Sequence, residues 1–270
     1  MSEKQRYFIE LAYDGTNYHG WQVQQNAVSV QEVLNKALAT ILREPVETTG
    51  CGRTDTGVHA REFFLHFDVK SIVDSRWTIV NEEGQNTMDY GLWAMDKIRS
   101  LNALLPDDIA VKRIIPVHPE AHARFDAVLR SYEYHIHFSK DPFRINHSWE
   151  LRDKPDIALM NAAAKIIMEY TDFSCFSKSN TQTFTNNCKI SRAEWVEKED
   201  GLVFHISADR FLRNMVRAIV GTLMLVGKKE TEPEEVRAII ESKNRSNAGT
   251  SVPACGLYLT EVKYPYPLAP

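Results

Sequence analysis

The alternation of hydrophobic and polar residues predicts two helices and several strands in the first half of the chain. Residues 6–14 alternate with a period of two and predict a strand. Ser29 and Glu32 have capping-box spacing, and apolar residues then recur at helical spacing as far as Arg43. Further strands are predicted at residues 46–49, 63–69 and 109–117, and a second helix at residues 92–105. The order β-α-β-β-α-β is typical of a split βαβ unit.

The same patterns predict a second half with similar element content. Residues 129–138 predict a strand with one apolar face, formed by Tyr132, Tyr134, Ile136 and Phe138. We expect helices at residues 155–170, 211–226 and 233–242, a hairpin at residues 189–198 and 202–208, and a closing strand at residues 256–264. Two polar stretches predict a surface excursion at residues 70–90 and a long polar loop at residues 171–187.

These elements predict an α+β protein of two sheet-and-helix halves with a cleft between them. Pro116 and Pro119 mark the junction, so we expect domains at residues 1–115 and 116–270. The length of 270 residues with 43% apolar and 25% charged residues is typical of a soluble globular protein.

Composition indicates the cellular compartment of the protein and limits the kinds of partner that it can bind. No apolar run reaches the roughly 20 residues of a membrane span, and the polar start is unlike a signal peptide. Four scattered cysteines indicate reduced thiols and a cytoplasmic protein. The net charge of −4 and pI of about 6.2 argue against a protein that coats nucleic acid nonspecifically. A local basic groove remains compatible with them.

The glycine-rich stretch at residues 50–60 is the main candidate for chemistry. It holds Arg53 and Asp55 between three glycines, which suits either an ordinary turn or a shaped functional loop. Asp55 there is a candidate nucleophile or general base, and Arg217 is its candidate partner, although a structural ion pair would have the same sequence. Arg217 continues a basic stripe on the helix predicted at 211–226, formed with Arg210 and Arg213.

Other stretches give weaker signals. Residues 18–26 are rich in aromatic and amide side chains, which suits either RNA contact or a loop packed under the first sheet. His118 with His122, and His135 with His137, have metal-ligand spacing but lack further ligands. The chain has no P-loop and no GxSxG nucleophile signature, and Gly50-Cys51-Gly52 lacks the strand-to-helix setting of a dinucleotide site.

Several motifs together resemble the tRNA pseudouridine synthase A family. Gly52-Arg53-Thr54-Asp55-Thr56-Gly57-Val58-His59-Ala60 is similar to the family's catalytic motif, with Thr56 in place of the usual Ala and Cys51 where Ala is common. Further similar segments lie in order along nearly the whole chain, at residues 13–22, 29–32, 102–106, 123–127, 130–134, 215–221 and 256–259. The 70–90 excursion is longer than in compact members.

The resemblance implies a fold, an activity and partners. The two α+β halves would have mainly antiparallel sheets joined side by side, with helices packed on one face and the active cleft between the halves. The enzyme would be an isomerase that converts uridine to pseudouridine at positions 38 to 40 in the tRNA anticodon stem-loop. It would act as a homodimer and use no metal or organic cofactor.

The resemblance also implies residue roles. Asp55 would be the essential carboxylate, acting on the sugar, on the base or as a proton acceptor. Tyr132 would stack on the flipped uracil near the C5 proton, and Arg217 would pair with Asp55 and hold it ionised. Arg53 would contact RNA and help hold the base out, and Leu257 would pack against the uracil. A basic groove would use Arg53, Arg61, Arg210 and Arg213, with Lys228 and Lys229 as further candidates.

Two other functions remain open from the sequence. One is a noncatalytic RNA-binding or tRNA-folding module on the same scaffold, which need not keep Asp55, Tyr132 and Arg217 together. The other is a metal hydrolase built on the histidines, for which the sequence lacks complete ligand sets.

Overall fold

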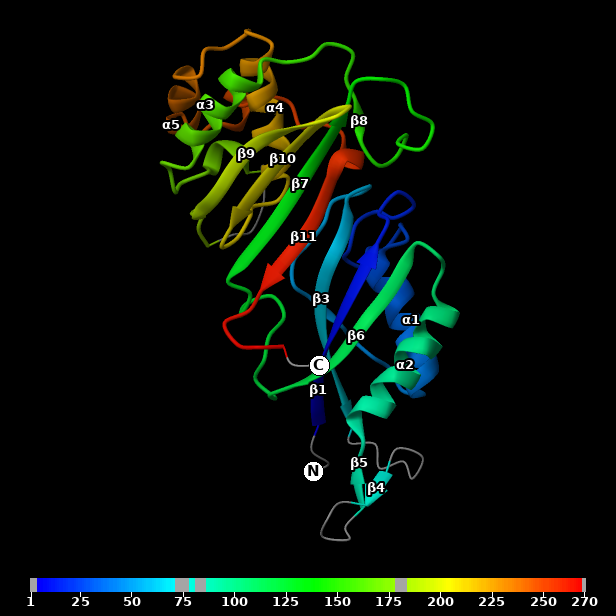
Figure 1. Ribbon diagram of the computed structural model, residues 1–270. Coiled ribbons are helices and arrows are strands. Elements are labelled where there is room, and N and C mark those ends of the chain that lie inside the picture. Colours follow the sequence, from blue (N-terminus) through cyan, green and yellow to red (C-terminus); the bar gives the residue numbers. More distant parts are fainter. Residues whose placement is uncertain (1–3, 71–77, 81–85, 178–183, 269–270) are drawn as a thin grey trace.

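The computed structural model describes residues 4–70, 78–80, 86–177 and 184–268. One continuous nine-stranded sheet runs through the molecule (Figure 1), with the order β6-β1-β3-β11-β7-β10-β9, β2 beside β3 and β8 beside β7. Its strands are β1 Lys4–Tyr13, β2 Thr49–Gly50, β3 His59–Lys70, β6 Ile109–Val117, β7 Leu129–His137, β8 Trp149–Glu150, β9 Ile190–Lys198, β10 Gly201–Ala208 and β11 Leu257–Lys263. A separate hairpin pairs β4 Thr78–Val80 with β5 Asn86–Met88.

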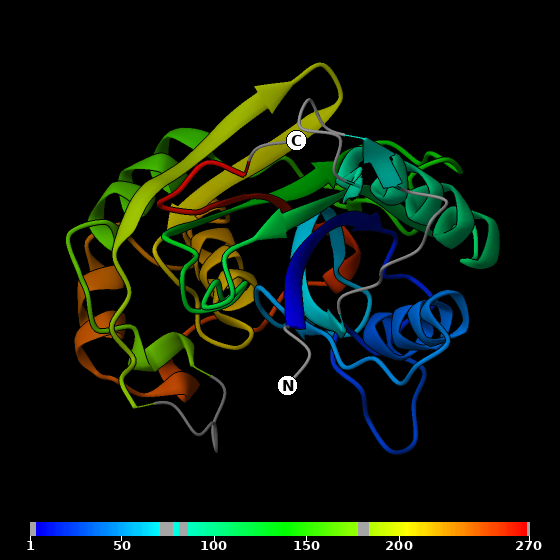
Figure 2. The ribbon, with the colours of Figure 1, turned by 90° about the horizontal axis from the view of Figure 1, so that it is seen from below.

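The α-helices lie in two groups. They are α1 Val30–Leu42, α2 Tyr90–Leu104, α3 Ile157–Ile167, α4 Met215–Gly227 and α5 Glu235–Glu241. Figure 2 shows α4 and α5 below the β7-β10-β9 side of the sheet and α1 below the β1-β3 side. α3 packs against α4 and β9, and α2 packs against β6 and α1. The predicted capping box forms in part, because the Ser29 hydroxyl accepts a hydrogen bond from the Glu32 amide at 3.3 Å. The α+β class with mainly antiparallel, joined sheets is confirmed.

The two halves meet at a short parallel contact between β3 and β11. Only Tyr258 with His59, and Leu259 with Ala60, are paired there, and β11 then pairs antiparallel with β7. The hydrophobic core accordingly has two clusters, one on each side of this contact. Leu259 belongs to the cluster of the first half, although it comes from the end of the chain. The domain boundary at residues 115 and 116 stays a prediction.

Some predicted elements differ from the observed ones. The strand predicted at 46–49 is only Thr49–Gly50, and the helix predicted from residue 211 begins at Met215. The predicted basic stripe on that helix is therefore wrong, because only Arg217 lies within it. Asn214 precedes the helix with φ +66°, so the chain turns there and the helix cannot extend back to residue 211.

Two further differences concern the polar stretches and one strand face. The polar-loop prediction is wrong at the start of residues 171–187, where Phe173, Cys175 and Phe176 are buried around the 3₁₀ turn Ser174–Phe176. Aromatic side chains there outweigh the polar composition, because they enter the second-half core. His137, which alternates with the apolar face predicted for residues 129–138 and so lies on the opposite face, is also buried. Residues 71–77, 81–85 and 178–183 of the two stretches lie outside the described residues, and residues 78–80 and 86–88 form the β4–β5 hairpin.

His66 on β3 connects the sheet to the segment at residues 121–127. The backbone amide of Ala123 donates a hydrogen bond to His66 Nδ1 at 3.1 Å, so the ring must leave that nitrogen unprotonated. Burial, assisted by the nearby Arg6 charge, lowers the pKa of His66 to about 4. The neutral ring is therefore part of the folded state.

This arrangement predicts that the protein loses stability as the pH falls. An unfolded histidine titrates near 6.5, so between pH 6.5 and pH 4 the unfolded state binds the proton and the folded state does not. The free energy of unfolding should fall across this window, by about 3 kcal/mol from His66 alone. Urea unfolding of wild type and His66→Gln at several pH values measures this contribution. Equal pH slopes for the two proteins would contradict it.

Candidate active site

The opening segment of the chain holds the Asp55 loop in place. The Tyr13 hydroxyl lies 2.9 Å from the Thr54 hydroxyl, and the Trp21 amide donates to the Thr54 carbonyl at 3.3 Å. The Gly57 amide donates to the Tyr18 carbonyl, also at 3.3 Å. Tyr18 and Trp21 are buried, so of the two interpretations of residues 18–26 the packed loop is correct for these side chains.

Close backbone approach explains the glycines around Asp55. Gly20 has φ +86°, and a Cβ atom on it would lie 2.3 Å from the Thr54 carbonyl oxygen. Gly57 has φ +76°, a backbone conformation that residues with a side chain rarely adopt. The loop is therefore a shaped structure and not an ordinary solvated turn.

Two arginines face the carboxylate of Asp55. Arg213 Nε lies 3.6 Å from Asp55 Oδ1, and Arg217 Nη1 lies 3.7 Å from Asp55 Oδ2. Both distances exceed those of a good hydrogen bond, so these contacts are ion pairs. Within the described ranges, no donor hydrogen-bonds to the Asp55 carboxylate oxygens. Asp55 is partly exposed, with 23% of its side-chain surface accessible, and its oxygens are free to meet a substrate.

A second contact orients Arg217. Its Nε donates to the Val252 carbonyl at 2.7 Å, and the Val252 amide donates back to the Arg217 carbonyl at 3.3 Å. The loop before Val252 is fixed in turn by Arg245, which donates to the Gly249 carbonyl at 3.0 Å. The guanidinium therefore presents Nη1 to Asp55 in a set direction.

Tyr132 lies on β7 between the two core clusters and packs against both. Its ring meets Phe211 edge-on, with centroids 5.2 Å apart. Burial raises the pKa of the Tyr132 hydroxyl, with Cys51 and Asp55 adding to the effect, so the phenol stays neutral at physiological pH. Cys51 itself is buried, and burial raises the pKa of its thiol to about 11, which excludes it as a ready nucleophile.

Arg130 is an important residue that the sequence reasoning missed. Its buried guanidinium donates to four backbone carbonyl groups from three segments of the chain. Nη2 donates to Cys51 and to Arg124, each at 2.7 Å, and Nε donates to Cys51 at 3.2 Å. Nη1 donates to Ala127 at 3.1 Å and to Asp209 at 2.9 Å. The available signal was an Arg two residues before Tyr132, on the otherwise apolar face of a strand.

The structure also places the remaining predicted residues. Arg53 is exposed beside Asp55, and Leu257 is buried in the second-half core together with Val58. Arg210 is half-buried just after β10.

Arg61 is not brought to Asp55. It pairs with Glu133 at 3.1 Å, and Glu133 points to the sheet face opposite Tyr132 because neighbouring strand residues alternate.

Lys229 is also remote from Asp55, since it pairs with Asp156 at 3.6 Å near the far end of α4.

Neither histidine pair assembles a metal site. His135 forms a hydrogen bond with Glu133 at 2.9 Å, and His122 Nδ1 accepts hydrogen bonds from the backbone amides of residues 124 and 125. In the part of the chain that the structure describes, no cluster of His, Cys, Asp or Glu could hold a metal ion. The described helices include none long and apolar enough to span a bilayer.

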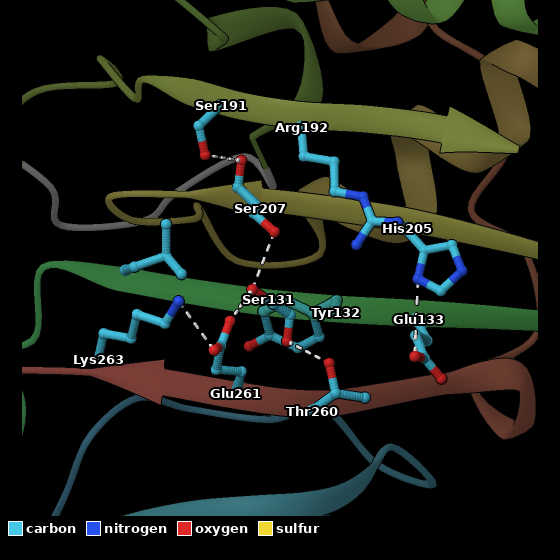
Figure 3. Close-up of a pocket in the computed structure, with 11 residues that line it drawn as sticks. Ser131, Tyr132, Glu133, Ser191, Arg192, His205, Ser207, Thr260, Glu261 and Lys263 are labelled. Atoms are coloured by element: carbon cyan, nitrogen blue, oxygen red, sulfur yellow. Dashed lines mark hydrogen bonds and ion pairs between the residues drawn. The ribbon is translucent and has the colours of Figure 1, made fainter.

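A polar pocket of about 360 Å³ opens on the sheet face opposite Tyr132's side chain (Figure 3). Its side chains bond one another, as Ser131 does with Ser207 at 2.8 Å and with Glu261 at 3.0 Å. Lys263 pairs with Glu261 at 3.0 Å. Asp55 does not line this pocket, so it is distinct from the candidate active site.

Comparison with known proteins finds related chains over nearly the whole length. A family model described as tRNA pseudouridine synthase matches residues 169–265. A "tRNA pseudouridine synthase A" of Bacteroides fragilis is 49% identical, with 97% of each chain covered. One of Bacteroides thetaiotaomicron is 50% identical over 97% of this chain and 91% of its own. One of Clostridium acetobutylicum is 36% identical over 95% and 98%.

The bonds of Arg130 predict a large effect of a charge-conserving substitution. Arg130→Lys keeps one cation but cannot reach four carbonyl groups from three directions, so buried acceptors lose partners. We expect the free energy of unfolding to fall by about 2–4 kcal/mol, as measured by urea titration. Amide hydrogen exchange should accelerate in residues 50–57 and 121–127. The exposed Arg152→Lys is the control, and equal stability of both variants would refute the role.

Proposed function

The chain belongs to the tRNA pseudouridine synthase A family, and we propose that Asp55 is the essential carboxylate with which it isomerises uridine in tRNA. We further propose that the target lies in the anticodon stem-loop, at positions 38 to 40. The observation that best supports the role of Asp55 is its carboxylate, which is free of hydrogen bonds among the described residues and faces two guanidinium groups at 3.6 and 3.7 Å. The site of action in tRNA rests on the family resemblance.

The reaction requires a nucleotide outside the helical stack. Uridine becomes pseudouridine when the bond from N1 to the ribose breaks and C5 bonds to the same ribose carbon. C5 then loses its proton and N1 gains one, so the product is an isomer of the substrate. A paired, stacked base hides these atoms, so the nucleotide must flip into the cleft. Asp55 then acts on the sugar, on the base or as a proton acceptor, and the geometry supports all three equally. The proposed chemistry needs no metal or organic cofactor.

Tyr132 and Leu257 suit the two faces of a flipped uracil. The raised pKa of Tyr132 favours a neutral ring that stacks, since a phenolate that accepts the C5 proton would be scarce at neutral pH. Leu257 lies at the start of β11, whose next residues pair with β7 near Tyr132. The proposed pocket therefore takes Asp55 from the first half and its other walls from the second.

An acidic protein can bind RNA through such a cleft. Arg53, Arg210 and Arg213 lie around Asp55 or just before α4, although the whole chain carries a net charge of −4. Charge concentrated in a cleft steers a phosphate backbone without a basic surface elsewhere. Arg61 lies on the other sheet face, so its RNA contact would need RNA that passes the edge of the cleft. Homodimer formation stays a prediction of the family resemblance.

The role of Asp55 predicts that Asp55→Asn forms no product and still binds RNA. The amide keeps the shape of the side chain but cannot act as a nucleophile or base, so the rate should fall at least about 1,000-fold. Unmodified tRNA is incubated without added metal and with a chelator, and pseudouridine is mapped by chemical adduct and primer extension. Exposed Asp107→Asn is the matched control. Product from Asp55→Asn would sink the assignment, and tight binding without product from wild type would favour a noncatalytic module.

The basic cleft predicts a salt-dependent affinity. If Arg210 contacts one phosphate, Arg210→Ala should reduce the slope of log affinity against log salt by about one unit. Filter binding of tRNA over a range of salt concentrations measures the slope, with exposed Arg152→Ala as the control. A wild-type affinity that does not change with salt would contradict a phosphate-binding cleft.

A further inference from the structure

Phe125 is an exposed aromatic side chain on a tightly fixed segment. It has 75% of its surface accessible, whereas Ala121, Ala123 and Ala127 of the same segment are buried. The His122 ring lies against Phe125 on one side, with centroids 4.3 Å apart. The guanidinium carbon of Arg124 lies 5.7 Å from the Phe125 ring centre. The Phe125 ring is therefore packed against His122 on one side and open to solvent elsewhere.

Hydrogen bonds fix the backbone beneath Phe125. His122 Nδ1 accepts from the Arg124 and Phe125 amides at 3.1 and 3.2 Å. Asp126 accepts from the His122 amide at 2.7 Å and from the Tyr266 hydroxyl at 2.8 Å. An exposed aromatic ring on a rigid support loses little conformational entropy when it binds a partner.

The segment stands directly beside the Asp55 loop. Arg130 Nη2 donates to the carbonyls of both Cys51 and Arg124, each at 2.7 Å, so one nitrogen atom separates the two backbones. Burial lowers the pKa of Arg124, and the nearby charges of Arg53, Arg130 and Arg210 lower it further. Phe125 and Arg124 thus lie next to the group of arginines around the Asp55 loop.

We propose that Phe125 is a stacking platform for an unpaired tRNA base next to the target nucleotide, with Arg124 binding the adjoining phosphate. This rests on the proposed action on a stem-loop, where loop bases are free to stack. Aromatic side chains beside a cationic groove bind single-stranded RNA by this combination of stacking and charge. The platform is separate from Tyr132, which receives the target base itself.

The charge around Phe125 favours RNA over a protein partner. Among the residues that the structure describes, no carboxylate lies within ion-pair distance of Arg124, and its charged neighbours are arginines. Phe143 provides the contrast, since it is 91% exposed and also neighbours an arginine in the chain, which here follows the ring and does not precede it. That arginine, Arg144, pairs with Asp141 at 3.2 Å and Asp200 at 3.6 Å. Phe143 therefore offers a matched control with its neighbouring charge neutralised.

The test uses the full chain and an anticodon stem-loop RNA that carries 2-aminopurine at one loop position at a time. Wild type should quench the fluorescence at a position beside the target, because the base stacks on Phe125. Phe125→Ala and Phe125→Leu should abolish this quenching and weaken binding about 10- to 100-fold. Phe125→Trp should restore both, whereas Phe143→Ala should change neither. KM should rise in the Ala and Leu variants while kcat stays within about 2-fold.

Each other outcome is informative. If the Leu variant binds as well as wild type, an apolar contact suffices and base stacking is wrong. If Phe125→Ala leaves RNA affinity unchanged but alters the sedimentation coefficient, the ring belongs to an interface between copies, which also overturns the proposal. If wild type quenches the probe but forms no product on unlabelled stem-loop, the platform stands and the proposed site of action in tRNA fails.

Discussion

The arrangement of the segments around Asp55 depends on a buried positive charge that is satisfied by backbone carbonyl groups. Burying a guanidinium is costly unless its donors are bonded, and Arg130 meets this condition with carbonyls from three segments. Those segments carry Arg53 and Asp55, Arg124 and Phe125, and Arg210. Because a guanidinium is planar with donors in fixed directions, it sets the three segments at fixed relative positions. Long-range geometry thus depends on one side chain that touches no substrate in the proposed reaction.

Each half of the molecule needs the other, either for its hydrophobic core or for its part of the candidate active site. The sheet continues from β3 to β11 through only two residue pairs, and the final strand contributes to the core of the first half. Asp55 comes from the first half, while Arg213 and Arg217 come from the second. Asp55 and the two arginines meet because the halves pack together beside the contact between β3 and β11. The hydrogen bond to the Val252 carbonyl then directs the Arg217 side chain.

Charged side chains are distributed unevenly over this protein. The chain is acidic overall, yet Arg213 and Arg217 meet Asp55 where the two halves join, while Glu133 pairs with Arg61 on the other sheet face. Such an arrangement would confine the proposed attraction for RNA phosphate to the surroundings of Asp55. The described pocket on the opposite sheet face is lined by Glu133 and Glu261 together with Arg192 and Lys263, so charges of both signs are present there.

The sequence alone determined the class of fold, most elements and the family, because hydrophobic periodicity and local motifs are properties of short stretches. It also singled out Asp55, Tyr132 and Arg217, although their roles remain predictions. Tertiary structure decided what depends on residues far apart in the chain. The polar stretch before residue 178 enters the core through Phe173 and Phe176, and Arg61 points away from Asp55 because of its strand face. The carbonyl bonds of Arg130 involve backbone atoms, which carry no residue identity, so no sequence pattern records them.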